Sequence, residues 1–320
     1  PYWFPLKKTP LFTQMTAALG QVGQFLSAVP FLALLHGPGW NTAFLSLGAV
    51  GVLVAIAAGV AVADSPETWA AAKAAKDPDH VPEKKDPAER IPLGRLLLMV
   101  LREPLCWQGF LNHYSAMLLQ IVFTLLWSAP LITLGMGLPT SAIGMVLTVN
   151  VLASIAAGPI LGPVSARLGR NRVLASITFS GFIGLAWIIF FLPAEPRGIT
   201  ALIIVNIVMA FFTPSSNFGF DDIREDLDRS IVATATGMAN MGGFLAGMFA
   251  AQAVGLLLDH SSNGQAYTWV DFRYAWWAVI VTWGIGMAGL ITSRIVVSRR
   301  RAARSRSGRG GVRVVDSSEE

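Results

Sequence analysis

The chain has 320 residues, of which 53% are apolar and only 13% are charged, and its formal net charge is +5. Soluble domains carry about a quarter charged residues. Two windows, 9–63 and 104–166, contain no Lys, Arg, Asp or Glu at all. Because a soluble fold cannot cover such long apolar windows, the composition excludes an ordinary soluble domain and indicates a membrane protein.

Eight apolar stretches are long enough to cross a bilayer as helices. Each has about 20 to 28 residues, and a hydrocarbon core roughly 30 Å thick requires about 20. We therefore predict an all-α, multi-pass bundle of transmembrane helices. In chain order, the predicted spans are 11–35, 41–63, 107–134, 140–162, 173–193, 198–220, 232–258 and 274–295.

The first span contains an eight-residue pattern that returns in the seventh. Residues 20–27 (GQVGQFLS) and 239–246 (ANMGGFLA) have small, amide, apolar and phenylalanine positions in the same order. Internal repeats of this kind are typical of transporters built from duplicated halves. Five predicted spans lie between the copies and one span follows each copy, so the repeating unit has six spans. We expect 1–63 to hold the last two helices of an N-terminal bundle, 107–295 to hold a complete second bundle, and four helices to be missing before them.

Basic residues mark one side of the membrane. Of the 24 Lys and Arg residues, 22 lie on one set of alternating connecting segments, and only Arg197 and Arg273 lie on the other. Basic connections remain in the cytoplasm. The pattern therefore predicts a protein of the cell (cytoplasmic) membrane whose inter-bundle loop, 64–106, and C-terminal tail, 296–320, are cytoplasmic.

The loop and the tail have different compositions. Within the loop, 93–102 combines apolar residues with Arg95 and Arg102, which favours an amphipathic helix on the inner membrane surface that links the two bundles. The tail is rich in Arg, Gly and Ser, so we expect it to be disordered. Because it directly follows a span, we expect its arginines to contact anionic membrane lipid and not nucleic acid.

Ligands for a metal or cofactor are scarce in the sequence. The chain has one cysteine, Cys106, which excludes an internal disulfide. Its four histidines share no metal-ligand spacing with one another or with carboxylates. It also has no glycine-rich phosphate loop of the Gly-x-x-x-x-Gly-Lys type. We therefore predict neither a metal nor another cofactor.

Polar side chains inside the spans are the candidate binding groups, because such groups are costly in hydrocarbon unless they are paired or face water. Amides recur on one face of the first span and, with a histidine, on one face of the third. The alternative is that they hydrogen-bond neighbouring helices, at about 0.6 to 2 kcal/mol each. The candidate substrate-binding residues are Gln21, Gln24, His113, Gln120, Asn150, Asn206 and Asn240.

His113 differs from the amides because it is titratable. An imidazole can exchange a proton near neutral pH, so His113 is a candidate for proton or substrate binding. It also lies within a turn or two of the predicted inner surface, where a pairing or interfacial role is equally open.

The turn after the fourth span reads GPVSARLGRNR at 162–172. It resembles the major facilitator superfamily signature, written Gly-x-Leu-Ala-Asp-Arg-x-Gly-Arg-Lys. Ala166 replaces the acidic residue of the signature and Asn171 replaces its second basic residue. The matching positions, for which the resemblance implies a gating role, are Gly162, Arg167, Gly169 and Arg170.

The N-terminal segment carries a second resemblance. Trp3-Phe4-Pro5 and the amide-rich segment 20–24 are similar to the fifth and sixth helices of bacterial members of that superfamily. The resemblance covers most of 3–295, as helices five to twelve of twelve. It implies a secondary carrier that moves a small solute by alternating access, coupled to an ion gradient with a proton as one candidate.

Two other classes of protein stay open. One is a membrane sensor or interaction remnant that transports nothing. The other is an intramembrane enzyme, which would require a catalytic constellation at depth. The predicted spans contain no Asp or Glu and no paired His, so the sequence favours the carrier over the enzyme.

Overall fold

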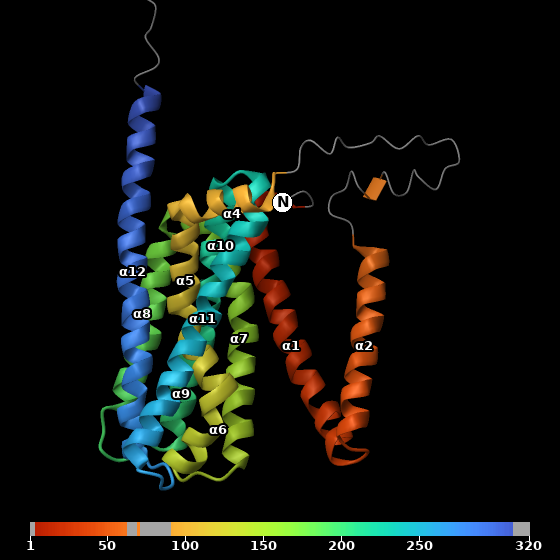
Figure 1. Ribbon diagram of the computed structural model, residues 1–320, viewed down its shortest axis with the longest axis vertical. Helices are drawn as coiled ribbons and strands as arrows, with labels where there is room; N and C mark the ends of the chain where they lie inside the picture. The colour runs from red at the N-terminus through yellow and green to blue at the C-terminus, as the bar shows by residue number, and fades with distance from the viewer. Residues whose placement is uncertain (1–3, 63–68, 71–90, 310–320) are drawn as a thin grey trace, which may run out of the picture.

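The computed structural model describes residues 4–62, 69–70 and 91–309, and nearly all of them are helical (Figure 1). Side chains are described throughout these ranges except at 6, 24–29, 32 and 304–309. No strand occurs in the described ranges, which confirms the all-α fold class predicted from the apolar stretches.

Long helical rods, several of them built from consecutive helical elements, make up the described chain. Each predicted span overlaps one of these rods. The elements are η1 (Leu6–Lys8), α1 (Thr9–His36), α2 (Trp40–Ala61), α4 (Leu93–Arg102), α5 (Pro104–Ile121), η3 (Val122–Trp127), α6 (Ser128–Pro130), η4 (Leu131–Gly135), α7 (Ser141–Leu168), η5 (Gly169–Asn171), α8 (Arg172–Phe191), α9 (Ile199–Phe212), η6 (Thr213–Asn217), α10 (Phe218–Asp226), α11 (Arg229–Ser262) and α12 (Trp269–Arg309).

Figure 1 shows α5 to α12 packed as one bundle, with α4 lying across one end and α1 and α2 forming a hairpin at its side. We call the end that holds α4 the basic end, because it also carries the arginines of the α7–α8 turn and of the last part of α12. At that turn Gly169 has φ +48°, a left-handed conformation that glycine adopts without a side-chain clash. The chain reverses there between α7 and α8.

Six helical segments within the described residues are long and apolar enough to cross a membrane. One of them, Ser141–Phe191, contains both α7 and α8, and the other five correspond to α2, the α5–η4 rod, the α9–α10 rod, α11 and α12. α1 is not among the six. These segments confirm a multi-pass transmembrane bundle.

The loop and the tail differ in how well they were predicted. The helix predicted at 93–102 is α4, with those bounds, and its Val100 is buried against α5 and α11. The predicted disordered tail at 296–320 is wrong in its first part, because α12 continues through Arg309. Ala and Arg are strong helix formers, so the basic stretch extends the helix beyond the apolar span.

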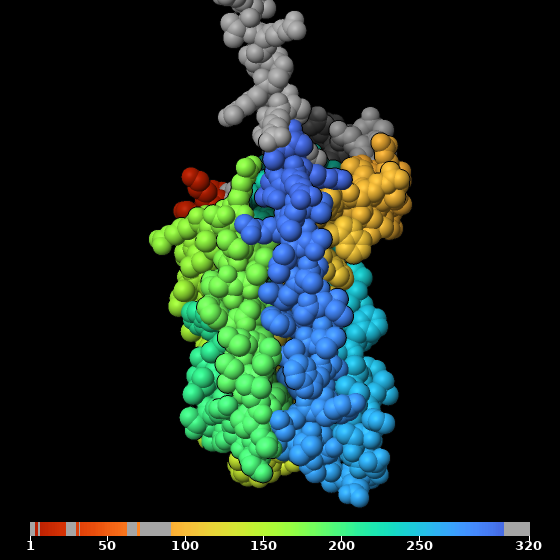
Figure 2. Space-filling model, turned by 90° about the vertical axis from the view of Figure 1, so that its left-hand side faces the viewer, coloured from red at the N-terminus to blue at the C-terminus, as the bar shows by residue number. Residues whose placement is uncertain are grey.

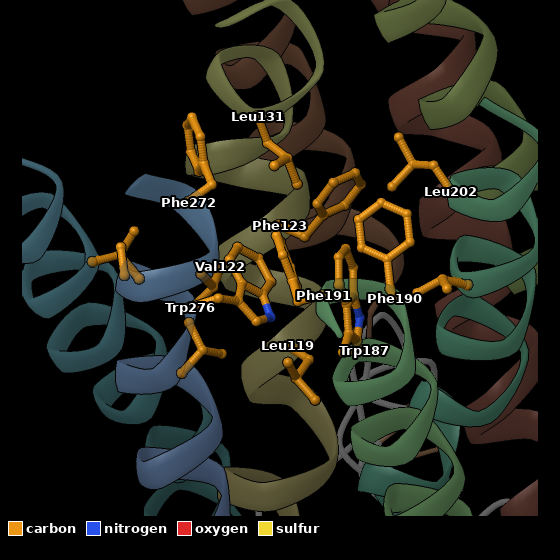
Figure 3. Close-up of a cluster of buried hydrophobic side chains, with 14 of the residues drawn as sticks. Leu119, Val122, Phe123, Leu131, Trp187, Phe190, Phe191, Leu202, Phe272 and Trp276 are labelled. Atoms are coloured by element: carbon orange, nitrogen blue, oxygen red, sulfur yellow. The ribbon is translucent and has the colours of Figure 1, made fainter. Parts of the chain in front are cut away.

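An aromatic core fills the half of the bundle farther from the basic end. Trp187 of α8 and Trp276 of α12 lie with ring centroids 4.8 Å apart, and both are almost fully buried. Phe123 of η3 contacts the same cluster, as Figure 3 shows. Aromatic pairs at such distances contribute about 0.5–1.5 kcal/mol beyond area burial. The cluster therefore fixes α5, α8 and α12 relative to one another.

Small residues bring helix backbones into direct contact elsewhere. A Cβ added at Gly242 of α11 would lie 2.2 Å from the carbonyl oxygen of Phe110 on α5, and one added at Gly219 would lie 2.9 Å from Gly109 Cα. Stripes of small residues permit this close approach between membrane helices. The α5–α11 contact consequently depends on the absence of side chains and not on a pattern of apolar ones.

Replacing Gly242 with Ala should therefore destabilise the bundle. Forcing an extra methyl group into a packed interface costs about 1–3 kcal/mol. The Phe110 carbonyl belongs to the backbone of a helix and cannot rotate away from the added methyl group. Gly237→Ala is the matched control on α11, because a Cβ there meets nothing within 4 Å. Thermal unfolding of both variants in detergent should show a lowered midpoint for Gly242→Ala alone, and equal midpoints would contradict this packing account.

Candidate functional site

A cavity of about 210 Å³ lies among α1, α5, α7, η6 and α11. One wall comes from α1 of the N-terminal hairpin, and the other walls come from the bundle. Most of the polar groups are amides and hydroxyls. The polar residues of the lining are Gln14, Gln21, His113, Gln120, Ser154, Thr213, Ser216, Asn217 and Asn240.

The cavity brings together four of the candidates predicted from the sequence. Gln21 comes from α1, His113 and Gln120 from α5, and Asn240 from α11. His113 and Gln120 are seven residues apart, which places them on one face of α5, two turns apart. The side chain of Gln24 lies outside the described residues, so its predicted role remains a prediction.

Asn150 and Asn206 lie behind the cavity and do not line it. Gln120 Nε2 donates to Asn150 Oδ1 at 2.7 Å, and Asn150 Nδ2 donates to Asn206 Oδ1 at 3.1 Å. Asn206 in turn donates to the carbonyl of Leu202 at 3.0 Å, and both asparagines are buried. This chain of amides ties α5, α7 and α9 together, as the helix-pairing alternative expects, and it orients Gln120 at the cavity wall.

His113 is almost completely buried, with 3% of its surface exposed. Its Nδ1 accepts a hydrogen bond from the backbone N–H of Gly243 at 3.2 Å. Its ring stacks on Phe220 with the ring centroids 5.2 Å apart. Because Nδ1 is the acceptor, the neutral ring carries its proton on Nε2, which can donate a hydrogen bond.

Gln14 joins α1 to the bundle, although it was not among the predicted site residues. Its Nε2 donates to the carbonyl of Pro214 at 2.8 Å, and its Oε1 accepts from Asn217 Nδ2 at 3.3 Å. Gln14 lies two turns before Gln21 on the same face of α1, and this spacing is the sequence signal that identifies it. Both Gln14 and Asn217 line the cavity.

Buried charges hold the basic end of the bundle together. The guanidinium of Arg172, 2% exposed, donates to both carboxylate oxygens of Glu225 at 2.6 Å and to Asp222 at 3.2 Å. Its Nε donates to the carbonyl of Ser165 at 2.8 Å. The bidentate geometry suits a planar guanidinium and makes these bonds strong. Arg172 thereby joins the ends of α7, α8 and α10.

A second set of bonds extends from this cluster to α1. Ser165 Oγ donates to Asp221 at 2.6 Å, and Arg224 Nη1 pairs with the same carboxylate at 3.4 Å. Arg224 Nη1 also donates to Thr13 Oγ1 at 2.9 Å. The charged cluster of the bundle therefore contacts the N-terminal hairpin through one arginine.

The four predicted gating residues fall into two pairs. Gly162 lies at the closest approach of α7 to α1, where a Cβ would be 2.8 Å from Leu11 Cα, and Gly169 makes the left-handed turn. Arg167 and Arg170 are exposed, and among the described residues neither forms a hydrogen bond or ion pair. Their gating role remains a prediction.

Arg172 was not predicted as a functional residue, because it lies in the same basic turn as the exposed Arg167 and Arg170 and the sequence does not distinguish it from them. The available signal was the group of acids at 221–225, which is unusual at the end of a span in a chain so poor in charge. In the described ranges, no three His, Cys, Asp or Glu side chains gather as ligands for a metal ion.

The fold and the cavity define a class of protein: a multi-pass helical membrane protein with an amide-lined cavity between its helices. A family model described as Major Facilitator Superfamily matches residues 2–251, most of the chain. The chain belongs to the major facilitator superfamily, a family of membrane transporters. No curated protein matches the chain.

Two asparagines can separate the structural amides from the cavity-facing ones. Asn206→Ala should lower the unfolding temperature, because it leaves Asn150 without one partner in a buried network, where each interhelical bond contributes about 0.6 to 2 kcal/mol. Asn240→Ala should leave the unfolding temperature unchanged, since Asn240 is exposed at the cavity and has no hydrogen bond among the described side chains. Thermal unfolding of both variants checks this, and an equal loss in both would remove the distinction.

Proposed function

We propose that the chain is part of a secondary transporter that moves a small solute by alternating access, driven by an ion gradient. The observation that carries the proposal is the position of the cavity. Its walls come from α1, which the repeat assigns to the first half, and from helices assigned to the second half. A binding site between two repeats is the arrangement used by alternating-access carriers.

The contacts between α1 and the bundle support a carrier held closed at its basic end. Leu11 meets Gly162, Gln14 bonds to Pro214 and Asn217, and Thr13 bonds to Arg224, all near the start of α1. Toward its other end α1 diverges from α7 (Figure 1). Basic segments remain cytoplasmic, so in the proposed orientation within the cell membrane this conformation faces outward.

The cluster around Arg172 gives the gate its rigidity. Because Arg172 binds residues of α7 and α10, these two helix ends and the start of α8 are expected to move as one unit. Opening the basic end then requires only the separation of α1 from this unit. The bonds to be broken are neutral or singly charged hydrogen bonds, which cost far less to break than the buried Arg172 pairs.

The lining favours a small solute with hydrogen-bonding groups. The amides of Gln21, Gln120 and Asn240 supply donors and acceptors, and Met117 and Phe244 supply apolar contact. His113 is the one titratable side chain among the described lining residues, which makes it the candidate site for a coupling proton. The described lining residues include no carboxylate or thiol that could complete a catalytic constellation, and this favours the carrier over an intramembrane enzyme.

The repeat also supports the proposal that further helices complete the N-terminal bundle. Gly242 of the second copy contacts α5 closely, but a Cβ at its counterpart Gly23 would meet nothing within 4 Å. Most residues of α2 are exposed as well. Such apolar faces require a helix or lipid to cover them, and the six-span unit supplies helices at the equivalent positions. If those further helices are absent from the full-length protein, a membrane sensor or interaction remnant is the second candidate function.

Transport by the full-length protein in proteoliposomes tests the proposal. A panel of labelled amino acids, sugars, nucleosides and small carboxylates is offered under an imposed pH gradient and membrane potential. A transported solute should show a several-fold higher half-saturation concentration for Gln120→Ala, and a changed pH dependence for His113→Ala. Gln252→Ala is the control, because this exposed amide of α11 lies outside the cavity lining.

Absence of gradient-driven accumulation for every member of the panel, in protein that folds and inserts normally, would favour the sensor. Equal effects of the Gln120 and Gln252 variants would show that the cavity does not lie on the solute path.

A further inference from the structure

A second cavity, of about 330 Å³, lies at the basic end on the outer face of the bundle. α5, the start of α8 and the last part of α12 line it, and Figure 2 shows this face, with α12 in blue lying between α8 in green and α4 in orange. We call it the arginine pocket. Its polar lining residues are Gln108, Arg170, Arg294, Ser298 and Arg301.

The charge in the arginine pocket is one-sided. Among the described residues, three guanidinium groups line it and no carboxylate does. Arg170 and Arg294 have no ion pair within the described part of the chain, and Arg301 pairs with Asp226. Arg170 and Arg301 also line an adjoining pocket that contains Asp226 and Glu103, whereas Arg294 lines the arginine pocket alone. Several arginines without enough carboxylates attract an oxyanion, because the planar guanidinium binds phosphate oxygens in pairs.

Gln108 provides an independent observation. The residue is 3% exposed, lines the arginine pocket and forms no hydrogen bond to any described residue. Because the described residues do not fully enclose its amide atoms, a group bound in the pocket can hydrogen-bond to them. An acceptor oxygen bound in the pocket would satisfy its N–H donors. Ser298 is not available in the same way, since its hydroxyl donates to the carbonyl of Ile295.

The position of the pocket indicates which oxyanion enters it. Arg294 lies at the end of the span predicted at 274–295, the level at which lipid headgroups meet the protein. Next to it, the outer face exposes Leu174 of α8 and Ile291 of α12, which acyl chains can cover. A basic pocket between spans beside an apolar face suits a lipid phosphate, which carries its own chains.

We propose that the arginine pocket binds the phosphate group of an anionic phospholipid from the leaflet at the basic end. Arg170 and Arg294 bind the phosphate oxygens, and Gln108 donates to one of them. The lipid thereby links the α7–α8 turn to α12. This proposal does not depend on the transport activity proposed above, because it concerns a different face of the bundle.

Thermal unfolding of the delipidated full-length protein in a neutral detergent tests this site. Dioleoyl phosphatidylglycerol should raise the unfolding temperature with saturation, and dioleoylglycerol, which lacks the phosphate, should not. Arg294→Gln should raise the lipid concentration for half-maximal stabilisation by about tenfold. Arg299→Gln is the matched control, because it removes the same charge from an exposed position of α12 outside the pocket. Gln108→Leu, which nearly preserves volume, should also weaken the response, and it provides the test if Arg294→Gln does not fold.

Three results would overturn the proposal. Equal stabilisation by dioleoylglycerol would show that acyl chains alone bind. Equal losses for Arg294→Gln and Arg299→Gln would reduce the effect to general surface charge. Equal stabilisation by inorganic phosphate alone would replace the lipid with a soluble phosphate as the ligand.

Discussion

Backbone contact through glycine is the constraint on which this structure depends. At Gly242 and Gly219 it joins α11 and η6–α10 to α5, and at Gly162 it joins α7 to α1. In a bilayer, lipid is as apolar as leucine, so helices gain little from apolar side chains alone and gain more from close packing. The contact at Gly162 also fixes where α1 packs against the bundle, and the cavity between α1 and the bundle lies beside this contact.

The polar interactions within the bundle differ from those between the bundle and α1. Within the bundle of α5 to α12, Asn150, Asn206 and the guanidinium of Arg172 are buried and hydrogen-bonded, while their partners Gln120 and Glu225 are partly exposed. Between that bundle and α1, the described side chains form the hydrogen bonds of Gln14 and Thr13, and no ion pair among the described residues crosses this boundary. A strong interior and a weaker boundary are what a rigid unit requires if it is to move against its neighbour.

The sequence predicted the positions of the helices well, because long charge-free windows leave few alternatives to transmembrane spans. It also predicted α4 with its observed bounds, since two arginines seven residues apart lie on one face of an otherwise apolar helix there. It did not predict the continuation of α12, because a basic tail of good helix formers resembles a disordered arm in composition. Local sequence patterns therefore predicted where the helices lie more accurately than where they end.

The site was predicted only in part, for a physical reason. Helical periodicity shows which residues share a face, but not which helix lies opposite. His113 and Gln120 face the cavity as expected, while Asn150 faces Asn206 on another helix. Arg172 binds Asp222 and Glu225, about fifty residues away, and the spacing of residues along the chain does not predict this contact. Long-range side-chain partners require the folded arrangement.

Spin-label distances at the two ends of the α1–α7 pair test the central claim, that α1 and the bundle move as two rigid parts around the cavity. One label pair is placed at Lys8 and Ala166 near the basic end, and the other at His36 and Thr140 near the opposite end. Gly162→Leu forces the helices apart where α7 touches Leu11. The account predicts that the Lys8–Ala166 distance lengthens while the His36–Thr140 distance shortens. A lengthening at the basic end with no change at the other would contradict it.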